Sequence, residues 1–429
     1  MNEQIDPIST LAIFADRFKT EQPPEGSREV MRLCALDWAI CGLGAADDAI
    51  LSAMHRHADT GDTGSCALFL SAASAPPRMA ALINGTISHA LDFDDTHFGH
   101  IGHVSTVVFP AALAAAQSEG RDFDAFLTAA RIGAEVAVRV GLWLGRAHYQ
   151  IGWHQTATAG AYGAAVAAAM LMDAPIDATL SIVAGTATGQ KAQFGSAMKP
   201  MNAGLAAAHG VEAAQLAKAG LSGSHDILSG VLATQAGEGN LHAFDGLGED
   251  WLFDTVSHKY HACCHGTHAM IEALLSLGAI DIAQIEEITL TTHPRWMPVC
   301  NKPAPTTWLE GKFSYRFLAA LILRGGRTIG SEPEGFFPLD ATSRDLMDRM
   351  DVTANEAVAE TDTMLEIALK DGEVLQARFD LAAAEPLDQR RQKLLAKGEA
   401  LLRHGLGQQV SAAIEARDLA AFITAIRQV

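Results

Sequence analysis

The 429-residue sequence predicts a mainly α protein with a smaller α+β domain. Alanine-rich stretches such as GAYGAAVAAAMLMDAP (160–175) repeat small residues every three or four positions, which lets helices pack closely on all sides. The segment IEEITLTTH (285–293) alternates polar and apolar residues as a strand does. MLEIALKDGEVLQARFD (364–380) places two such runs around Asp371-Gly372, which indicates a β-hairpin.

The order of these patterns along the chain predicts two domains, and a length of 429 residues also favours two domains over one. Helical patterns extend from residue 7 to about residue 256. Strand patterns follow, with a helical segment between them at 313–323, so residues 257–386 are expected to form the α+β domain. The chain becomes helical again after this point. We therefore expect residues 1–256 and 387–429 to form one large all-helical domain from both chain ends.

Composition excludes several classes of protein. The hydrophobic fraction of 49 % and the mean hydropathy of +0.12 indicate a substantial buried core. No apolar run is long enough to cross a bilayer, and the N-terminus lacks the basic-then-apolar order of a signal peptide. We expect a cytoplasmic protein with no membrane partner.

The cysteine content and the net charge indicate which bonds and which ligands to expect. The six cysteines have no regular spacing and no CxxC pair, so reduced thiols are expected rather than disulfides or structural zinc. The formal net charge of −19 disfavours a nucleic-acid partner, because phosphate binding depends on Lys and Arg. An anionic substrate would need a local positive patch.

The stretch LDFDDTHFGHIGHVSTVVFP (91–110) concentrates proton-handling groups. The preceding MAALINGTISHAL is expected to be helical, and Gly99 and Gly102 indicate a helix end near residue 97. Residues three apart share a helix face, which would group Asp92 with Asp95, and His97 with His100 and His103.

Three interpretations of this stretch stay open: a metal site, an acid/base site that grips carboxylates, or a polar loop. In the polar loop, Asp94 and Asp95 would be solvated and Thr96 would cap a turn. His100 is expected at the surface in any case.

Two further motifs carry isolated candidates. In GWHQTATAG (152–160), His154 precedes an alanine-rich helix whose free N–H groups would welcome an anion; the alternative is a packing histidine. The glycine-rich run 185–204 matches neither a phosphate loop nor a dinucleotide fingerprint. Within it, Lys199 lies between apolar neighbours and could grip a carboxylate, unless it is an ordinary surface lysine; Lys191 is expected to face solvent.

HKYHACCHGTH (258–268) collects four histidines, a lysine and two cysteines at the expected domain junction. Its HxxH spacing invites a zinc interpretation, but the usual paired CxxC and HxxxH arrangement is missing. Together with residues 91–110, it is a natural candidate for the positive patch, and domain junctions are favoured ligand sites.

In combination the motifs resemble the MmgE/PrpD family, which includes 2-methylcitrate dehydratase, cis-aconitate decarboxylase and iminodisuccinate epimerase. They occur in the family's order and cover most of the chain. The resemblance rests on NGTISHALDFDDTH followed by His103 and Pro110, GWHQTATAG, KPMNAGLAAAHGVEAAQLAKAGLSG, KYHACCHGTHAMIEALL and, more weakly, EGKFSYRFLAALI and LKDGEVL.

The resemblance implies a large helical domain, an inserted α+β lid domain, an active site in the cleft between them, and a homodimer. It also implies that no metal or organic cofactor is needed. By matching motifs, the implied catalytic residues are Asp92, His103, His154, Lys199 and His265. The implied substrate-binding residues are Thr96, Lys259 and His268, although either histidine of the 265/268 pair could be the catalytic one.

The implied activity is a cofactor-independent acid/base lyase for a small di- or tricarboxylate, with 2-methylcitrate dehydration expected first. Lysines and protonated histidines would hold the carboxylates and stabilise the charge that develops. A histidine or aspartate would then move the proton. His103 or His154 is expected as the base, the His265/His268 pair as acid or carboxylate clamp, and Asp92 as the group that tunes a histidine.

Other outcomes stay open. An epimerase or a decarboxylase would use the same site, and Val104, Met198 and Asn202 depart from the family's usual residues, which weakens transfer of a particular substrate. The DxDD pattern of terpenoid cyclases is present at 92–95, but such enzymes stabilise carbocations with aromatic walls, and a content of 6 % aromatics with a histidine-rich site disfavours that activity. A metal-dependent hydrolase and a carboxylate-binding protein without activity are the remaining alternatives.

Overall fold

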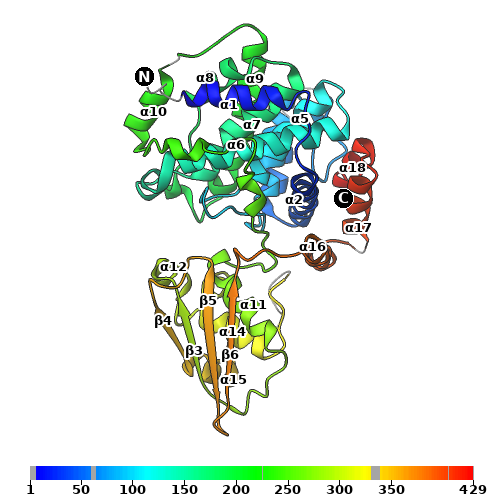
Figure 1. Ribbon diagram of the computed structural model, residues 1–429. Helices are drawn as coiled ribbons and strands as arrows, with labels where there is room; N and C mark the ends of the chain where they lie inside the picture. Colours follow the sequence, from blue (N-terminus) through cyan, green and yellow to red (C-terminus); the bar gives the residue numbers. More distant parts are fainter. Residues whose placement is uncertain (1–5, 59–63, 225, 330–338, 404, 429) are drawn as a thin grey trace. The chain divides into compact units, whose positions relative to one another are not determined.

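The computed structural model describes residues 6–58, 64–224, 226–329, 339–403 and 405–428 (Figure 1). The chain forms two compact units. The first ends at His258 and resumes at Leu387, and the second comprises Lys259–Pro386, so the first boundary follows His258 rather than residue 256. The predicted fold class, mainly α with a smaller α+β part, is confirmed.

The first unit is built almost entirely of helices. In chain order they are α1 (Pro7–Arg17), α2 (Glu25–Gly44), α3 (Ala49–Ala58), α4 (Pro77–Ser88), α5 (Ser105–Ser118), α6 (Phe123–Gln150), α7 (Gln155–Met172), α8 (Ile176–Ala184), α9 (Met198–Lys218), α10 (Ile227–Gln235), α16 (Leu387–Leu401), α17 (Leu406–Glu415) and α18 (Leu419–Ile426). Short 3₁₀ helices accompany them: η1 (Lys191–Gln193), η2 (Leu241–Phe244) and η3 (Leu252–Thr255). The unit is not all helical as expected, because β1 (Cys66–Ala67) and β2 (Ser74–Ala75) form an antiparallel pair.

Helix α7 is the centre of this unit and packs against α5, α6, α8 and α9. All but one of its residues are buried. Close helix contacts are made through glycine, as the small-residue pattern predicts: a Cβ on Gly204 of α9 would lie 2.2 Å from the carbonyl oxygen of Leu82 in α4. Helices α4 and α9 can therefore approach closely, and each leads into a candidate motif.

The expected continuation of α4 to residue 97 is wrong, because the helix ends at Ser88. Asp92 and Ile101 have φ values of +52° and +56°, which take the backbone out of the right-handed helical region. The polar residues of the 89–104 segment therefore lie on a loop and do not share helix faces. Thr96 forms an isolated antiparallel bridge with Ser257.

The second unit contains a four-stranded sheet in the order β4-β3-β5-β6, in which β3 and β4 are parallel and the other neighbours antiparallel. The expected hairpin is present, with Gly372 in its turn at φ +92°. Helix α11 packs on β5, β6 and α14. The elements are η4 (His265–Thr267), α11 (His268–Ser276), β3 (Ile285–Thr292), η5 (Pro294–Trp296), α12 (Met297–Cys300), α13 (Trp308–Gly311), α14 (Tyr315–Leu323), α15 (Ala341–Asp348), β4 (Met350–Ala354), β5 (Asp362–Leu369) and β6 (Val374–Asp380).

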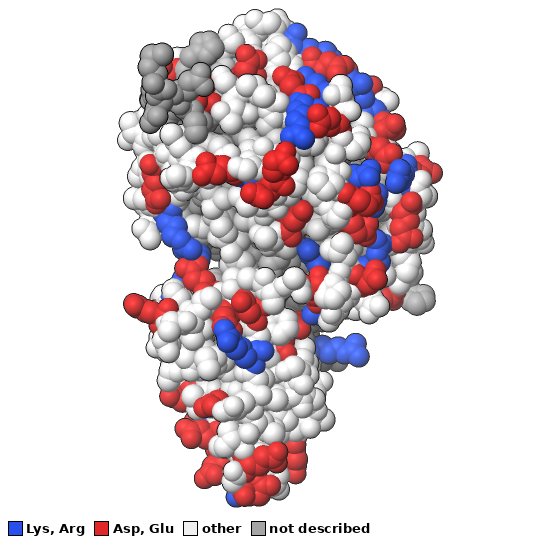
Figure 2. All heavy atoms as spheres, in the orientation of Figure 1, with Lys and Arg blue, Asp and Glu red and all other residues white. Residues whose placement is uncertain are grey.

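The molecular surface reflects the acidic composition. Figure 2 shows Asp and Glu side chains spread over the visible face, with Lys and Arg in shorter groups among them. Within the described parts of the chain, none of the helices combines the length and apolar character required to span a membrane.

Candidate active site

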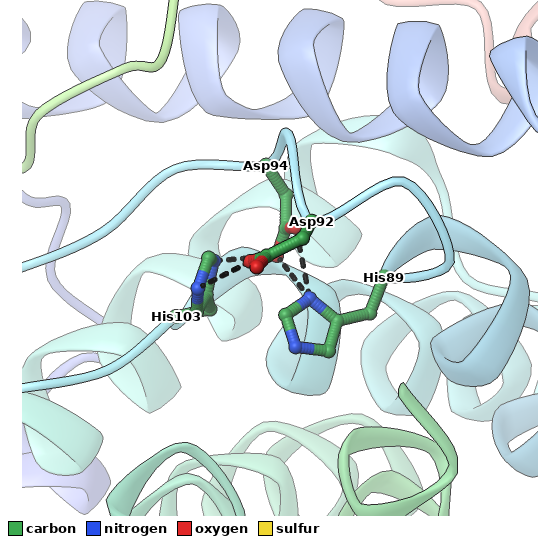
Figure 3. Close-up of side chains that lie close together, drawn as sticks. All are labelled: His89, Asp92, Asp94 and His103. Atoms are coloured by element: carbon green, nitrogen blue, oxygen red, sulfur yellow. Dashed lines mark hydrogen bonds and ion pairs between the residues drawn. The ribbon is translucent and has the colours of Figure 1, made fainter. Parts of the chain in front are cut away.

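A buried carboxylate, Asp94, forms the centre of the loop after α4 (Figure 3). Its two oxygens lie 2.9 and 3.1 Å from Nδ1 of His89, and Oδ2 lies 3.0 Å from Nδ1 of His103. Burial opposes ionisation, but the neighbouring His103 and His89 outweigh it and hold the pKa of Asp94 far below its usual value. The solvated Asp94 of the polar-loop interpretation is therefore wrong.

A second carboxylate, Asp92, lies on the other side of His103. Its Oδ1 is 3.2 Å from Nε2 of His103 and 2.6 Å from Nζ of Lys199. The Asp92 side chain is 44 % exposed, whereas that of Lys199 is only 17 % exposed. Lys199 is thus not an ordinary surface lysine. The three side chains form one charge chain that is open to solvent at Asp92.

The protonation of His103 follows from this arrangement. Burial disfavours the imidazolium, but Asp94 and Asp92 more than compensate and raise the pKa of His103. His89 behaves in the opposite way: burial lowers its pKa despite the contact with Asp94, and the nearby charges of Lys199 and His103 add to that effect. The site therefore favours a cationic His103 beside a neutral His89.

His154 lies directly before α7, as the sequence indicates, and its backbone N–H donates to the carbonyl of Gly189 at 2.9 Å. The ring is stacked with that of His89 at a centroid distance of 6.4 Å and meets the ring of Phe194 edge-on at 4.9 Å. Burial, followed by the charges of His89, Lys199 and His103, keeps the pKa of His154 well below its usual value. His154 is therefore a neutral imidazole close to a cationic one.

The loop is held to the helices that flank it. Asp95, which is also buried rather than solvated, accepts hydrogen bonds from the backbone N–H of Ser105 at 3.2 Å and from the Ser105 hydroxyl at the start of α5. The backbone N–H of His103 donates to Oγ1 of Thr156 at 3.0 Å, in the first turn of α7. These contacts fix the loop to α5 at Asp95 and to α7 at His103.

A buried lysine from the C-terminal segment supports the same loop. Nζ of Lys397 in α16 donates to the carbonyl oxygen of Phe93 at 2.6 Å and lies 2.6 Å from Oδ1 of Asp37 in α2. The Lys397 and Asp37 side chains are 0 % and 1 % exposed. Residues from both chain ends thus hold the backbone between Asp92 and Asp94.

Other candidates lie elsewhere or differ from expectation. Thr96 exchanges two backbone hydrogen bonds with Ser257, at 2.9 and 2.8 Å. His100 is fully buried instead of at the surface, and burial lowers its pKa to about 3. Lys191 packs on the ring of Tyr149 at 3.7 Å and donates to the Tyr149 carbonyl, so it does not simply face solvent.

Lys259, His265 and His268 belong to the second unit, and all three are buried there. The rings of His265 and His268 lie 4.6 Å apart. Burial, together with His265, His261 and Lys259, keeps the pKa of His268 well below its usual value.

Two groups in the described regions have donor atoms close enough to suggest a metal site, namely His89, Asp92, Asp94 and His103, and Cys34, Asp95 and His258. In the first group, the ammonium of Lys199 already lies 2.6 Å from Oδ1 of Asp92. In the second, Arg390 donates to Nδ1 of His258 at 3.0 Å, so the ring proton must lie on Nε2, the nitrogen facing Cys34. In each group, a cationic side chain of the protein therefore already contacts one of the donor residues.

Sequence reasoning missed His89 and the central place of Asp94. His89 is the C-cap of α4 and precedes the polar run 91–103 in the sequence. The only available signal was the composition of the LDFDD segment, in which an apolar Phe93 between two aspartates indicates partial burial.

Two segments of the chain match the domains of one known protein family. Residues 9–237 match the MmgE/PrpD N-terminal domain, and residues 261–420 match the MmgE/PrpD C-terminal domain. The second match extends beyond Pro386 into the helices α16 to α18, which pack in the first unit.

Curated relatives are similar over part of their length. A cis-aconitate decarboxylase-like protein of Aspergillus oryzae is 30 % identical over 59 % of this chain and 60 % of its own. The cis-aconitate decarboxylase of Homo sapiens is 30 % identical over 60 % of this chain and 57 % of its own. That of Aspergillus terreus is 25 % identical over 73 % of this chain and 71 % of its own. The chain thus matches less than two thirds of the length of the first two relatives.

Proposed function

Because the chain belongs to the MmgE/PrpD family, we propose that it is a cofactor-independent acid/base lyase for a small di- or tricarboxylate. Among the reactions of this class, we place decarboxylation of an unsaturated tricarboxylate such as cis-aconitate first, ahead of the dehydration expected from the sequence. The names of the curated relatives support this order.

One observation carries the proposal: His103 lies between the carboxylates of Asp94 and Asp92, with Lys199 on the same Asp92 oxygen. The two carboxylates favour a protonated imidazole, which is a general acid at neutral pH. Lys199 adds a positive charge that a substrate carboxylate can share. A general acid beside a carboxylate-binding cation is what allylic decarboxylation requires.

The chemical step needs a proton donor and no base. The carbon–carbon bond to one carboxylate breaks and releases CO₂, and its electron pair forms a new double bond. The electron pair of the former double bond takes a proton from His103 at the carbon that bears another carboxylate. Lys199 would hold that carboxylate and stabilise the charge that develops next to it.

The remaining parts of the site are assigned by family resemblance. We propose Thr96, Lys259, His265 and His268 as further contacts to the substrate carboxylates. A homodimer that needs no organic cofactor or metal, and a cytoplasmic location, stay predictions for this chain.

Dehydration is the second candidate, and the neutral His154 is the observation that favours it. Removal of water from a hydroxy-tricarboxylate such as 2-methylcitrate needs a base for the carbon-bound proton and an acid for the leaving hydroxyl. His154 and His103 would supply these two functions. Epimerisation would use the same pair, with the proton returned to the opposite face.

Two substitutions separate these reactions. His103→Gln removes the acid and should abolish every reaction of the site, whereas His154→Gln removes the base and should leave decarboxylation largely intact. Product formation from cis-aconitate and from 2-methylcitrate would be followed by proton NMR. Loss of decarboxylation in His154→Gln, with a normal rate in His103→Gln, would overturn the assigned roles.

A further inference from the structure

His89 touches Asp94 but has no part in the reaction proposed above. We propose that His89 is a positioning residue that locks the Asp94 carboxylate, and through it the ring of the general acid His103. This inference rests on the proposed function, because it concerns the same site. It assigns to His89 no contact with substrate.

The contacts between His89 and Asp94 leave the carboxylate little freedom. Nδ1 of His89 lies 2.9 Å from one Asp94 oxygen and 3.1 Å from the other, and the two side chains are 0 % and 1 % exposed. His89 is the C-cap of α4, a helix that packs against α5 and α9. The donor is therefore carried by a fixed element, whereas Asp94 lies on a loop.

His89 acts as a hydrogen-bond donor and not as a proton relay. The ring proton lies on Nδ1, since this nitrogen faces a carboxylate. Nε2 is buried and has no hydrogen-bonding partner among the residues described, so the ring's hydrogen bonding to the protein is directed at Asp94. A neutral ring with one committed N–H fits a group that orients a carboxylate.

The geometry links His89 to the orientation of His103. Asp94 contacts Nδ1 of both rings, and the rings meet edge-on at a centroid distance of 4.5 Å. Without the His89 donor, Asp94 would keep His103 as its main partner and would turn toward it. The His103 ring would follow, and Nε2 would leave the position from which it delivers a proton.

The test compares two substitutions that differ in one donor. In His89→Asn the amide nitrogen can occupy the place of Nδ1, whereas His89→Leu has a similar apolar volume and no donor. We expect kcat to fall about 100-fold in His89→Leu, as a displacement of roughly 1 Å in a catalytic group does. KM should stay close to that of the wild type because Lys199 is untouched, and His89→Asn should recover most of kcat.

A control separates this effect from general loss of stability. His55 in α3 bonds the carbonyl of Phe69 at 2.9 Å and is remote from the charge chain in sequence and in its contacts. His55→Leu makes the same chemical change and should leave kcat unaltered. If His55→Leu and His89→Leu lower kcat equally, the positioning role is refuted.

A second readout does not depend on turnover. The ring N–H protons that face Asp94 should give two downfield proton NMR resonances, one from His89 and one from His103. His89→Leu should remove one and shift the other, and His89→Asn should leave the His103 resonance in place. If the His103 resonance is not shifted in His89→Leu, the inference is wrong. This readout needs no turnover, so it also applies if the protein converts none of the carboxylates, an outcome that would contradict the proposed function.

Discussion

The ammonium of Lys199 lies 2.6 Å from Oδ1 of Asp92, the same oxygen that faces Nε2 of His103 at 3.2 Å. A substrate carboxylate that enters the site can share this ammonium. Lys199→Met should therefore lower kcat/KM by about 10- to 100-fold, because a hydrogen bond to a charged group contributes about 1.5–3 kcal/mol. Steady-state kinetics with cis-aconitate would measure the change.

Lys191 provides the matched control for this prediction. It lies in the same glycine-rich run, but its Nζ bonds the carbonyl of Tyr149 at 3.0 Å. Lys191→Met removes an equal charge and should change kcat/KM little. Equal losses in the two variants would mean that Lys199 acts through the general field of the protein and not through a direct contact.

The alkaline side of the pH–rate profile should depend on Asp94. Burial disfavours the cation, but Asp94 and Asp92 raise the pKa of His103, so the acid form persists above the usual histidine range and activity falls as pH rises through the raised pKa. Asp94→Asn removes the larger of the two attractive charges. The alkaline limb should then move to lower pH. A limb that stays in place would show that another group limits the rate.

Lys397 should affect both stability and rate. Lys397→Met leaves Asp37 buried without its cation, which should lower the free energy of unfolding by about 3–5 kcal/mol. The double variant Asp37→Leu/Lys397→Met should recover much of this stability in chemical denaturation. Its kcat should remain low, because the carbonyl of Phe93 has lost its donor. A stable double variant with the kcat of the wild type would contradict the supporting role of Lys397.

The close approach of α4 and α9 should be sensitive to a single methyl group. In Gly204→Ala the new Cβ would lie 2.2 Å from the Leu82 carbonyl, so the helices that lead to His89 and Lys199 must separate. We expect a loss of about 1–3 kcal/mol in stability and a lower kcat. Gly230→Ala in α10 meets no atom within 4 Å among the described residues and should be neutral or stabilising by up to about 1 kcal/mol. Thermal and chemical unfolding of both variants would test this contrast.

The fold was predictable from the sequence because its signals are local. Small residues at helical spacing, the alternation in residues 285–293 and the Asp371-Gly372 turn each constrain a short segment of backbone. Strand β4 (Met350–Ala354) was missed, because it is short and is stabilised by parallel pairing with β3, a contact between segments that are distant in sequence. The β1–β2 pair has only two residues in each strand and leaves almost no pattern.

The candidate site was predictable in its residue types but not in its geometry. The polar motifs identified Asp92, His103, His154 and Lys199 as candidates, whose catalytic roles stay predictions. Their contacts depend on a left-handed residue at Asp92 and on tertiary partners such as Lys397, which lies about 300 residues away in sequence. Spacing grouped Asp92 with Asp95, and His103 with His97 and His100, on the faces of a helix that ends before them. The polar-loop interpretation left Asp94 solvated, whereas it is the carboxylate shared by two histidines.

The most direct test of the acid/base lyase is to incubate the purified protein with cis-aconitate in D₂O and follow the products by proton NMR. Delivery of a solvent-derived proton by His103 predicts itaconate with one deuterium at the saturated methylene carbon and none at the vinyl carbon. The His103→Gln variant should form no product. Itaconate without deuterium, or no conversion of cis-aconitate, 2-methylcitrate or any related polycarboxylate, would contradict the account.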